Sequence, residues 1–494
     1  MKSLPLLAIL IIGSPAVRDQ GTPGTIDDAS RMNATHVRRI VDVSDDDAVA
    51  IAQIRSALAQ ARAEHIGISI AGFRHSLGGQ TIAPDGVVLN MLPHHRIELM
   101  NDGASVRVQS GAVWRDVILA LDHVARSVEV MQSDSNFTVG GSLSVNCHGW
   151  QHRHPPVAST VRAMTVLLPN GDVIRCSSGE NRELFAHVLG GYGLFGVILD
   201  ADLRTVPNER YRPRYTACDV DSYENVFDRE TRNERAVGMA YGRISVAPGA
   251  FLREAIVTTL QRESGPTPAL HEQRYAGIAR LVFRGSAERD SVKRLRWFLE
   301  RRVQPLVERR AVSRNEMLNN DIALYVDRSA ASTDILHEYF IPHGKLSTFI
   351  ARVRPILMRE RADLLNVTVR DIRKDDTTAL PYAREDVFGV VMFFHQSRSA
   401  AADALMQQLT RELIEEALAV GGTFYLPYRL HATPDQVRRA YPAIPEFFEE
   451  KRRVDPDQVF TNEWYLRYGH IVRLAALDPS PRMHCSPERS DGGE

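Results

Sequence analysis

The spacing of apolar residues near the start of the chain predicts a helix followed by a strand. Residues 48–63 place Ile51, Ile54 and Leu58 three or four positions apart, which is the spacing of one buried face of an α-helix. Ser44 stands just before three aspartates at the start of this segment, so it is the predicted N-cap. The short apolar run after the helix predicts a strand, and the pair indicates α/β packing.

Strand patterns and turn signals continue as far as Pro207. Two apolar runs, residues 164–168 and 173–175, flank an Asn-Gly pair and predict a β-hairpin. Residues 182–189 predict a short helix that ends at a glycine. Residues 197–206 alternate apolar and polar positions, as a half-buried strand does.

Beyond Pro207 the pattern changes to long amphipathic helices between strands. The helices are predicted at residues 291–310 and 401–420, and the strands at residues 336–341, 365–372 and 388–395. The chain is thus predicted to be an α+β protein, with an N-terminal domain (residues 37–207), a mixed α/β substrate or cap domain (residues 208–425) and a C-terminal segment that returns to the first domain (residues 426–470).

The two ends of the chain carry patterns of their own. Lys2, a short apolar run and small residues up to position 16 follow the order of a secretory signal peptide, residues 1–16. This pattern predicts an exported protein, periplasmic or secreted; a disordered or buried N-terminus is the alternative. Residues 17–36 are predicted to be a flexible lead-in, and residues 471–494 a disordered tail.

Composition narrows the set of partners. The chain has 494 residues, with 60 Lys and Arg balanced by 61 Asp and Glu, so no global field favours nucleic acid or an anionic membrane. Apart from its first residues, no segment has the apolar length of a membrane span, so we expect no stable membrane insertion. The four cysteines are too sparse to form a disulfide scaffold.

Three glycine-rich stretches carry the strongest functional signal. Residues 71–80 and 138–149 each follow an apolar, strand-like run and combine glycines with small hydroxyl residues. Such a backbone bends sharply and aims N–H groups at a diphosphate. A third stretch, residues 190–196, indicates one dinucleotide clamped by several loops. It contains the G-x-G-x-x-G pattern, but a predicted helix precedes it and a predicted strand follows it, which argues against the nicotinamide-binding Rossmann arrangement.

Histidines near these loops have alternative interpretations. His75 is either a polar loop residue that satisfies a backbone group or a covalent tether to the cofactor. Cys147, His148, His152 and His154 could be taken for a metal cluster, but their spacing matches no standard zinc pattern. We therefore predict no metal site and assign His148 to the hydrogen bonding of the glycine loop.

Candidate catalytic charges lie beyond the cofactor loops. Asp371 and Arg373 alternate on a predicted strand, so both face the same side, either as a structural ion pair or as a pair that grips the substrate. Residues 425–431 form a dense polar and aromatic group. Within it, Arg429 is a candidate positive charge for stabilising a reduced, anionic cofactor.

These strings resemble the FAD-linked oxidases of the vanillyl-alcohol oxidase (PCMH-type) superfamily. Residues 75–80 (H-S-L-G-G-Q) are similar to the loop that carries the histidyl-flavin link in aldonolactone oxidases, alditol oxidases and cytokinin dehydrogenases. Residues 138–143 resemble the second pyrophosphate loop of that superfamily, and residues 181–198 its third element. The resemblance implies a two-part PCMH-type FAD-binding domain and bound FAD, with a covalent link through His75. The cofactor-binding residues it suggests are Ala71, Gly72, Phe73, Arg74, His75, Ser76, Thr138, Gly140, Gly141, Ser144, His148, Gly149, Gly193, Gly196, Val197 and Ile198.

Two subfamilies compete for the substrate chemistry. Cytokinin dehydrogenases carry a catalytic aspartate before the Thr-Val-Gly-Gly loop, and Asp134 stands one residue away from that place. Sugar-lactone and alditol oxidases bind substrate with a strand of the form Glu-Ile-Arg. The segment from Asp371 to Arg373 resembles that strand with a shorter acid, and Arg429 replaces a nearby lysine of those enzymes.

We therefore expect an FAD-dependent oxidoreductase that oxidises a CH–OH group of a sugar, lactone or polyol-like small molecule by hydride transfer to flavin N5. Arg373 and Arg429 would orient and polarise the hydroxyl, and oxygen or another acceptor would reoxidise the flavin. One alternative is oxidation of a CH–NH group with Asp134 as the base. The other is a flavin-binding protein without catalysis.

Overall fold

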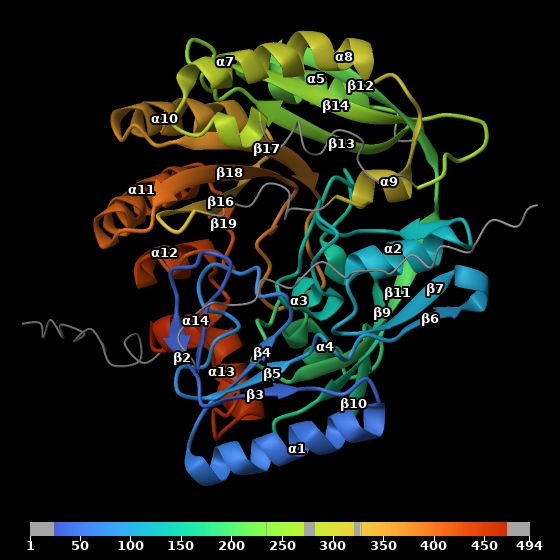
Figure 1. Cartoon of the computed structure of the whole chain (residues 1–494), viewed down its shortest axis with the longest axis vertical. Helices are drawn as coiled ribbons and strands as arrows, with labels where there is room; N and C mark the ends of the chain where they lie inside the picture. Colours follow the sequence, from blue (N-terminus) through green and yellow to red (C-terminus); the bar gives the residue numbers. More distant parts are fainter. Residues whose placement is uncertain (1–23, 234, 271–281, 321–326, 328, 472–494) are drawn as a thin grey trace, which may run out of the picture.

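The computed structural model describes residues 24–233, 235–270, 282–320, 327 and 329–471. These residues contain both helices and strands, which confirms the predicted α+β class (Figure 1). The predicted signal peptide and the tail from residue 472 lie outside the described residues. None of the described helices combines the length and the hydropathy that a bilayer-spanning segment needs.

The first sheet has three parallel strands in the order β3 (Arg39–Asp42), β5 (Val87–Asn90) and β4 (Ile68–Ala71). Helix α1 (Asp47–Glu64) packs against it through Ile54 and Leu58, as the apolar spacing predicts. The N-cap is Asp46, whose side chain accepts a hydrogen bond of 3.0 Å from the backbone N–H of Val49. The prediction of Ser44 as the cap is therefore wrong by two residues.

The second sheet is antiparallel and completes the N-terminal part of the fold. Its strands are β6 (Ile97–Met100), β7 (Ser105–Gln109), β8 (Arg126–Val128), β9 (Val161–Leu167), β10 (Val173–Ser177) and β11 (Val197–Pro207). The order is β10-β9-β11-β7-β6, with β8 also paired to β11. The pairing of β9 with β10 confirms the predicted hairpin. The helices in this region are α2 (Trp114–Asp122), α3 (Val139–Ser144), α4 (Arg182–Val188), η1 (Asn101–Gly103) and η2 (Val157–Thr160).

The third sheet has eight antiparallel strands and lies in the upper half of Figure 1. In chain order they are β12 (Arg210–Asp219), β13 (Val237–Ile244), β14 (Glu254–Arg262), β15 (Val312–Ser313), β16 (Ser332–Pro342), β17 (Leu364–Ile372), β18 (Val387–Ser397) and β19 (Thr423–Phe424). The spatial order is β15-β12-β14-β13-β17-β18-β16-β19. The three strands predicted for this region correspond to β16, β17 and β18.

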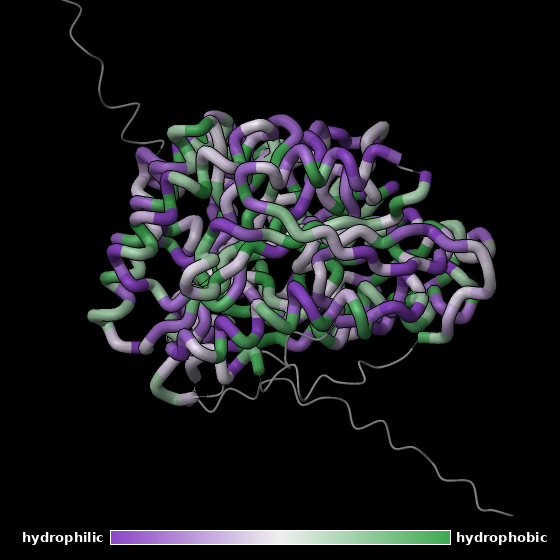
Figure 2. The backbone as a smooth tube through the Cα atoms, turned by 90° about the horizontal axis from the view of Figure 1, so that it is seen from above, coloured by the Kyte–Doolittle hydropathy of each residue, from purple (hydrophilic) through white to green (hydrophobic). Residues whose placement is uncertain are grey.

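Helices flank this sheet. They are η3 (Val220–Ser222), α5 (Tyr223–Thr231), α7 (Asp290–Phe298), η4 (Leu299–Val303), α8 (Gln304–Val307), α9 (Arg314–Leu318), α10 (Leu346–Arg359) and α11 (Ala400–Ala419). The predicted helix at 401–420 matches α11. The predicted helix at 291–310 is divided instead, because the π-helical turn η4 separates α7 from α8 and the helix ends at Val307. The view from above in Figure 2, from the side of α7 and α8, shows hydrophobic and hydrophilic stretches interspersed along the chain.

The last helices return to the first sheet. They are α12 (Pro434–Ala440), α13 (Ile444–Val454) and α14 (Glu463–Tyr468). Phe460 forms a parallel bridge with Ile68 of β4, and the N–H of Thr461 donates to the Ile68 carbonyl at 2.9 Å. In Figure 1 these helices lie beside the N-terminal strands. Part of the predicted flexible lead-in is ordered there, because β1 (Thr25–Ile26) pairs with β2 (Thr35–His36).

Candidate active site

The first glycine-rich loop begins where β4 ends at Ala71. A Cβ on Gly72 would lie 2.1 Å from the Oγ1 of Thr138, so the first and second glycine loops touch and leave no room for a side chain. The returning segment holds the first loop from the other side. The N–H of Leu77 donates to the Pro427 carbonyl at 2.9 Å, and the Gln80 side chain donates to the Leu426 carbonyl at 2.8 Å.

The second loop continues into helix α3. Thr138 is the N-cap, and its hydroxyl accepts a hydrogen bond of 3.3 Å from the N–H of Gly141. A Cβ on Gly140 would lie 2.6 Å from the Cβ of Ser110, so this glycine lets α3 approach the end of β7. Gly72 and Gly140 are therefore needed for close packing, whereas Gly79 in the first loop has a φ of 65°, in the left-handed region that favours glycine.

The third stretch connects α4 to β11. Gly193 has a φ of 74° and Gly196 a φ of 153°, and a Cβ on Gly196 would meet the Leu167 carbonyl at 2.7 Å. A helix precedes these glycines and a strand follows them, which confirms the order that argued against a Rossmann site.

A cavity of about 1240 Å³ lies between these loops and one face of the eight-stranded sheet. It is larger than the roughly 300–1,000 Å³ typical of a single-ligand site, so a dinucleotide and a substrate fit together. The predicted cofactor residues that line it are Ala71, Gly72, Phe73, Arg74, His75, Ser76, Thr138, Gly140, Gly141, Ser144, His148, Gly193, Gly196 and Ile198.

Two predicted cofactor residues lie outside this lining. Val197 is fully buried in the core between α1 and the sheets, because it points to the opposite face of β11 from Ile198. Gly149 packs on the backbone, where a Cβ would meet the Met131 carbonyl at 2.0 Å. Both residues shape the site from behind and do not face the cavity.

Buried hydroxyl groups test whether FAD fits the loop end of the cavity. In the described part of the chain, the side-chain oxygens of Ser76, Thr81 and Ser110 are buried and have no hydrogen-bond partner. All three residues line the cavity. Buried polar groups are normally hydrogen-bonded, and a diphosphate supplies the acceptor oxygens that these hydroxyls need. The loop end therefore fits the diphosphate of FAD.

His75 stands at the junction of the two loops. Its Nε2 lies 3.0 Å from the carbonyl oxygen of Asn136, and its ring stacks on Phe137 with centroids 4.0 Å apart. A carbonyl oxygen only accepts hydrogen bonds, so Nε2 carries a proton. The loop therefore fixes the orientation of the His75 ring.

The far end of the glycine loops carries a compact group of polar side chains, which we call the polar floor: Ser133, Asp134, His148, Glu338, Arg370 and Tyr428. The Nε2 of His148 lies 2.8 Å from Oε1 of Glu338, and both side chains are almost fully buried. The Tyr428 hydroxyl donates to the other Glu338 oxygen at 3.2 Å. Arg370 donates to the Ser133 hydroxyl at 3.0 Å, beside Asp134.

Charges in the polar floor are set by burial and by these contacts. Burial alone would raise the pKa of Glu338, but His148, Arg370 and the Tyr428 hydroxyl together hold it below its usual value. Burial lowers the pKa of His148, against the opposing charge of Glu338. We assign the charge of the pair to Glu338, because Arg370 and Tyr428 also support its carboxylate. Burial, followed by the charge of Glu338, raises the pKa of Tyr428 well above its usual value.

The structure places Asp371 and Arg373 outside this cavity, which corrects their predicted position. Side chains alternate along β17, and Thr368 and Arg370 occupy the cavity face, so Asp371 points to the opposite side. Asp371 lies 3.0 Å from His343, and Arg373 forms an ion pair with Asp386. Both residues line a separate polar hollow of about 360 Å³.

Arg429 is also turned away from the cavity. Its guanidinium contacts Asp403 at 2.8 Å and Asn33 at 2.6 Å, so its charge is already engaged. The neighbouring Tyr425 and Tyr428 line the cavity instead. Of the four predicted catalytic residues, Asp134 lies at the cavity and the other three do not.

Sequence reasoning missed Arg370 and Glu338. Each is one member of an alternating strand, and the choice between the two faces of a strand depends on what packs against it. The cap end of the cavity was also missed, where Trp150 stacks on Tyr241 with centroids 4.9 Å apart and Arg243 pairs with Glu300 at 2.9 Å. The alternation of side chains between the two faces of each cap strand is the sequence signal that could have identified these cavity-facing residues.

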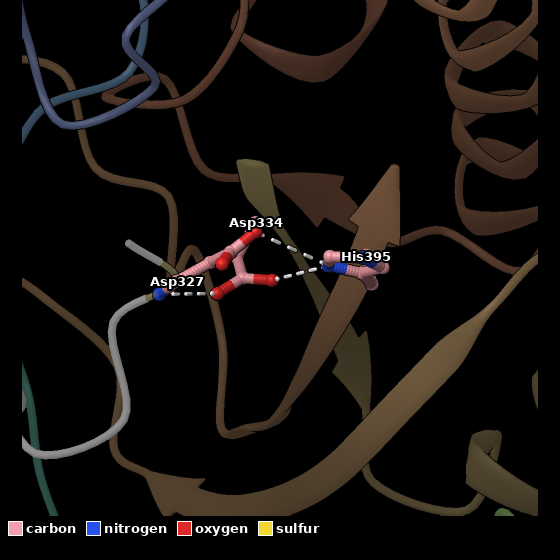
Figure 3. Close-up of side chains that lie close together, drawn as sticks. All are labelled: Asp327, Asp334 and His395. Atoms are coloured by element: carbon pink, nitrogen blue, oxygen red, sulfur yellow. Dashed lines mark hydrogen bonds and ion pairs between the residues drawn. The ribbon is translucent and has the colours of Figure 1, made fainter. Parts of the chain in front are cut away.

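A second polar cluster, drawn in Figure 3, is formed by residues that do not belong to the cavity lining. Among the described residues, Asp327, Asp334 and His395 are close enough to share a metal ion, with His395 Nδ1 3.0 Å from Asp334 and 3.8 Å from Asp327. Arg284, however, contacts Asp334 at 2.7 Å and Asp327 at 3.6 Å. Because Arg284 and His395, whose pKa is raised by Asp334, already pair with both carboxylates, we assign this cluster to a structural ion-pair network.

Comparisons with known proteins agree with the cofactor that the loops fit. Residues 48–177 match a family model described as an FAD binding domain. The chain is 26% identical over 429 residues to an uncharacterized oxidoreductase, ORF5 of the fasciation locus of Rhodococcoides fascians, a match that covers 83% of this chain and 90% of that protein.

Plant proteins are similar over both long and short segments. The chain is 26% identical over 434 residues to cytokinin dehydrogenase 10 of Oryza sativa subsp. japonica, covering 79% of this chain and 77% of that protein. It is 36% identical over 141 residues to cytokinin dehydrogenase 4 of Arabidopsis thaliana, with 27% of each chain covered. The chain is therefore an FAD-binding oxidoreductase of the vanillyl-alcohol oxidase (PCMH-type) superfamily.

Proposed function

We propose that this protein oxidises a CH–NH bond of a small molecule, with Asp134 as the base that takes the N–H proton. The position of Asp134 carries the proposal: of the predicted catalytic residues, it alone lines the cavity, at the polar floor beside the second glycine loop. The similarity to proteins named cytokinin dehydrogenase supports the same chemistry. The expected CH–OH chemistry relied on Asp371, Arg373 and Arg429, which lie elsewhere.

The residues of the polar floor would have different roles in such a reaction. Bound FAD would supply the redox chemistry by taking a hydride from the substrate carbon and passing the electron pair to oxygen or another acceptor. Asp134 accepts the nitrogen proton, so that a C=N bond forms as the C–H and N–H bonds break. Ser133 donates to Asp134 at 3.2 Å and to that extent orients its carboxylate. Arg370 donates to Ser133, and its charge helps to hold the pKa of Glu338 below its usual value.

The test is the rate of flavin reduction in an Asp134→Asn variant, followed anaerobically after mixing with secondary amines. A lost general base lowers this rate by about 10²–10⁴-fold. Asp116→Asn is the matched control, because Asp116 is exposed on α2, away from the cavity. Full activity of Asp134→Asn would remove Asp134 as the base and, with it, the observation on which CH–NH chemistry rests.

CH–OH oxidation of a sugar, lactone or polyol is the second candidate, and Arg370 is the observation that favours it. A cation in a buried site stabilises the developing negative charge of an alcohol oxygen. A panel of alcohols, lactones and amines distinguishes the two candidates by which class reduces the flavin. Arg370→Met should slow reduction by the alcohols if they are the substrates. Flavin that stays oxidised with every donor would support a binding protein without catalysis.

His75 is the proposed point of covalent attachment. Because Nε2 contacts the Asn136 carbonyl, Nδ1 would be the nitrogen that forms the link. Attachment would exchange one C–H bond of a flavin ring methyl group for a C–N bond to His75, and oxygen would accept the two electrons and two protons released. Acid precipitation of the purified protein should leave the yellow colour in the pellet, and His75→Ala should release it to the supernatant. The control is His95→Ala, at an exposed position. Colour in the supernatant of the unmodified protein would reduce His75 to a loop contact.

A further inference from the structure

The helical segment that roofs the cap end of the cavity exposes an apolar surface. Leu295 and Phe298 of α7 are 52% and 57% exposed, and Leu306 and Val307 of α8 are 62% and 69% exposed. Large apolar side chains on a soluble surface usually occur singly, and a group of them marks an interaction site. In Figure 1 this segment lies at the top of the molecule, at the opposite end from α1.

The same segment concentrates positive charge. Between positions 289 and 310 the chain has eight Lys and Arg residues against three Asp and Glu residues, whereas the whole chain has a formal charge of −1. Arg294, Arg302 and Arg309 are exposed beside the apolar side chains. The inward-facing cations are paired within the cap, as with Lys293 and Asp363 at 2.6 Å and Arg301 and Glu254 at 2.8 Å. The apolar residues and the exposed arginines together form what we call the α7–α8 face.

The cavity opens on this face. Leu299, Val303 and Gln304 line the cavity from the inner side of the segment. Val307 also lines it, although this side chain is 69% exposed. A side chain that both lines the cavity and is exposed marks the cavity's opening. A ligand leaving the cavity beside α8 therefore passes directly over the exposed apolar residues.

We propose that the α7–α8 face docks on the surface of an anionic lipid bilayer, with the cavity opening toward the lipid. A surface helix with exposed apolar side chains and flanking basic residues has the composition of an interfacial membrane anchor. Each basic residue near an anionic surface strengthens binding several-fold. A second copy of this chain is a poorer occupant, because a symmetric pairing would bring the exposed arginines of both copies together. This docking is independent of which donor the enzyme oxidises.

Sedimentation of the full-length FAD-loaded protein with lipid vesicles tests the proposal. We expect binding to vesicles of mixed phosphatidylcholine and phosphatidylglycerol, weaker binding at high salt, and little binding to phosphatidylcholine alone. The double variant Arg294→Glu/Arg302→Glu should weaken binding about tenfold or more. Leu306→Asp/Val307→Asp should also weaken it, by removing the apolar contact.

Matched controls are available at the far end and the side of the molecule. Arg39→Glu on β3 changes an exposed arginine, and Leu405→Asp on α11 changes a leucine that is 64% exposed. Both should bind vesicles like the unmodified protein. Retained flavin absorbance and an unchanged melting temperature show that each variant is folded.

Several results would overturn the proposal. Absence of binding to anionic vesicles at low salt would do so, as would equal loss of binding in the α7–α8 variants and the controls. A dimer in light scattering that becomes a monomer in Leu306→Asp/Val307→Asp, without vesicle binding by either form, would assign the face to a second copy of this chain. Failure of the donor panel to reduce the flavin would leave the docking result unaffected.

Discussion

At the scale of single residues, the charge of Glu338 organises the polar floor. This carboxylate reaches His148, receives a hydrogen bond from Tyr428 and lies within the field of Arg370. A buried charge is tolerated only where such partners surround it. The chemistry proposed for Asp134 would therefore take place beside one carboxylate whose charge is balanced and whose contacts are fixed.

Glu338→Gln should remove the part of the acid sensitivity that this carboxylate causes. The folded pKa of Glu338 is lower than its unfolded value, so its stabilising contribution is present above about pH 4.5 and is lost as the pH falls through the folded pKa. We expect a shallower loss of stability below about pH 4.5 in Glu338→Gln than in the unmodified protein, measured as urea midpoints. The difference belongs to the His148–Glu338 pair as a unit. Glu446→Gln, at an exposed position on α13, should keep the original profile.

At the scale of elements, the C-terminal end of α13 anchors the returning segment beneath the cofactor loops. Lys451 forms an ion pair with Asp455, and both side chains are fully buried. Asp455 also accepts the backbone N–H groups of Val459 and Phe460, at 3.1 and 2.9 Å. Phe460 bridges to β4, which leads into the His75 loop. The buried carboxylate of Asp455 thus fixes the path of the backbone after α13, which brings the returning segment to the cofactor loops.

Asp455→Ala should be strongly destabilising, by about 3–5 kcal/mol, because it leaves the Lys451 ammonium buried without a partner. Lys451→Met should cost less, since Asp455 keeps its two backbone donors. Urea unfolding followed by circular dichroism measures both variants. Asp457→Ala, an exposed neighbour, is the control and should change stability by no more than about 1 kcal/mol. A cost for Asp455→Ala as small as that of the control would show that the segment is held in place by other contacts.

At the scale of the whole molecule, residues 28–33 tie the cofactor loop to the cap sheet. The N–H of Gly79 in the first glycine loop donates to Asp28 at 2.9 Å. Two residues later, the Ser30 carbonyl accepts from Thr333 of β16 at 2.7 Å. The order found in this part of the predicted lead-in follows from these buried contacts, which join parts of the chain far apart in sequence.

Asp28→Ala should loosen this connection, so that FAD is released, or its loop opens if FAD is tethered through His75, at a lower temperature than in the unmodified protein. The change removes a buried acceptor from the Gly79 N–H and from Ser30, at a cost of about 1–3 kcal/mol. Flavin fluorescence during heating reports the release directly, or reports loop opening if the flavin is tethered. Asp28→Asn keeps one acceptor oxygen and should show a smaller shift. Identical release curves for all three proteins would mean that this tie does not hold the cofactor loop.

Local features of the fold and the site were more predictable from the sequence than non-local ones. The long helix α11, the β9–β10 hairpin and the central cap strands were predictable because their periodicity or turn residues act within a few positions. The end of α8 was not predictable, because it depends on contacts with the rest of the cap domain. The N-cap at Asp46 was not predictable either, because neighbouring polar residues compete for that position. The order in residues 24–36 depends on partners such as Thr333, about 300 positions away along the chain.

The sequence by itself determined the cofactor end of this protein. Glycines and hydroxyl residues at the ends of strands indicate a backbone that bends and packs closely around a diphosphate. This property is local, so it can be recognised in the sequence without knowledge of the fold. Only the tertiary structure decided the substrate end. A strand has two faces, and a shift of one residue exchanges them, so Arg370 faces the cavity while Asp371 faces away. Which face meets the flavin site is set by the packing of the whole cap sheet against the FAD-binding domain.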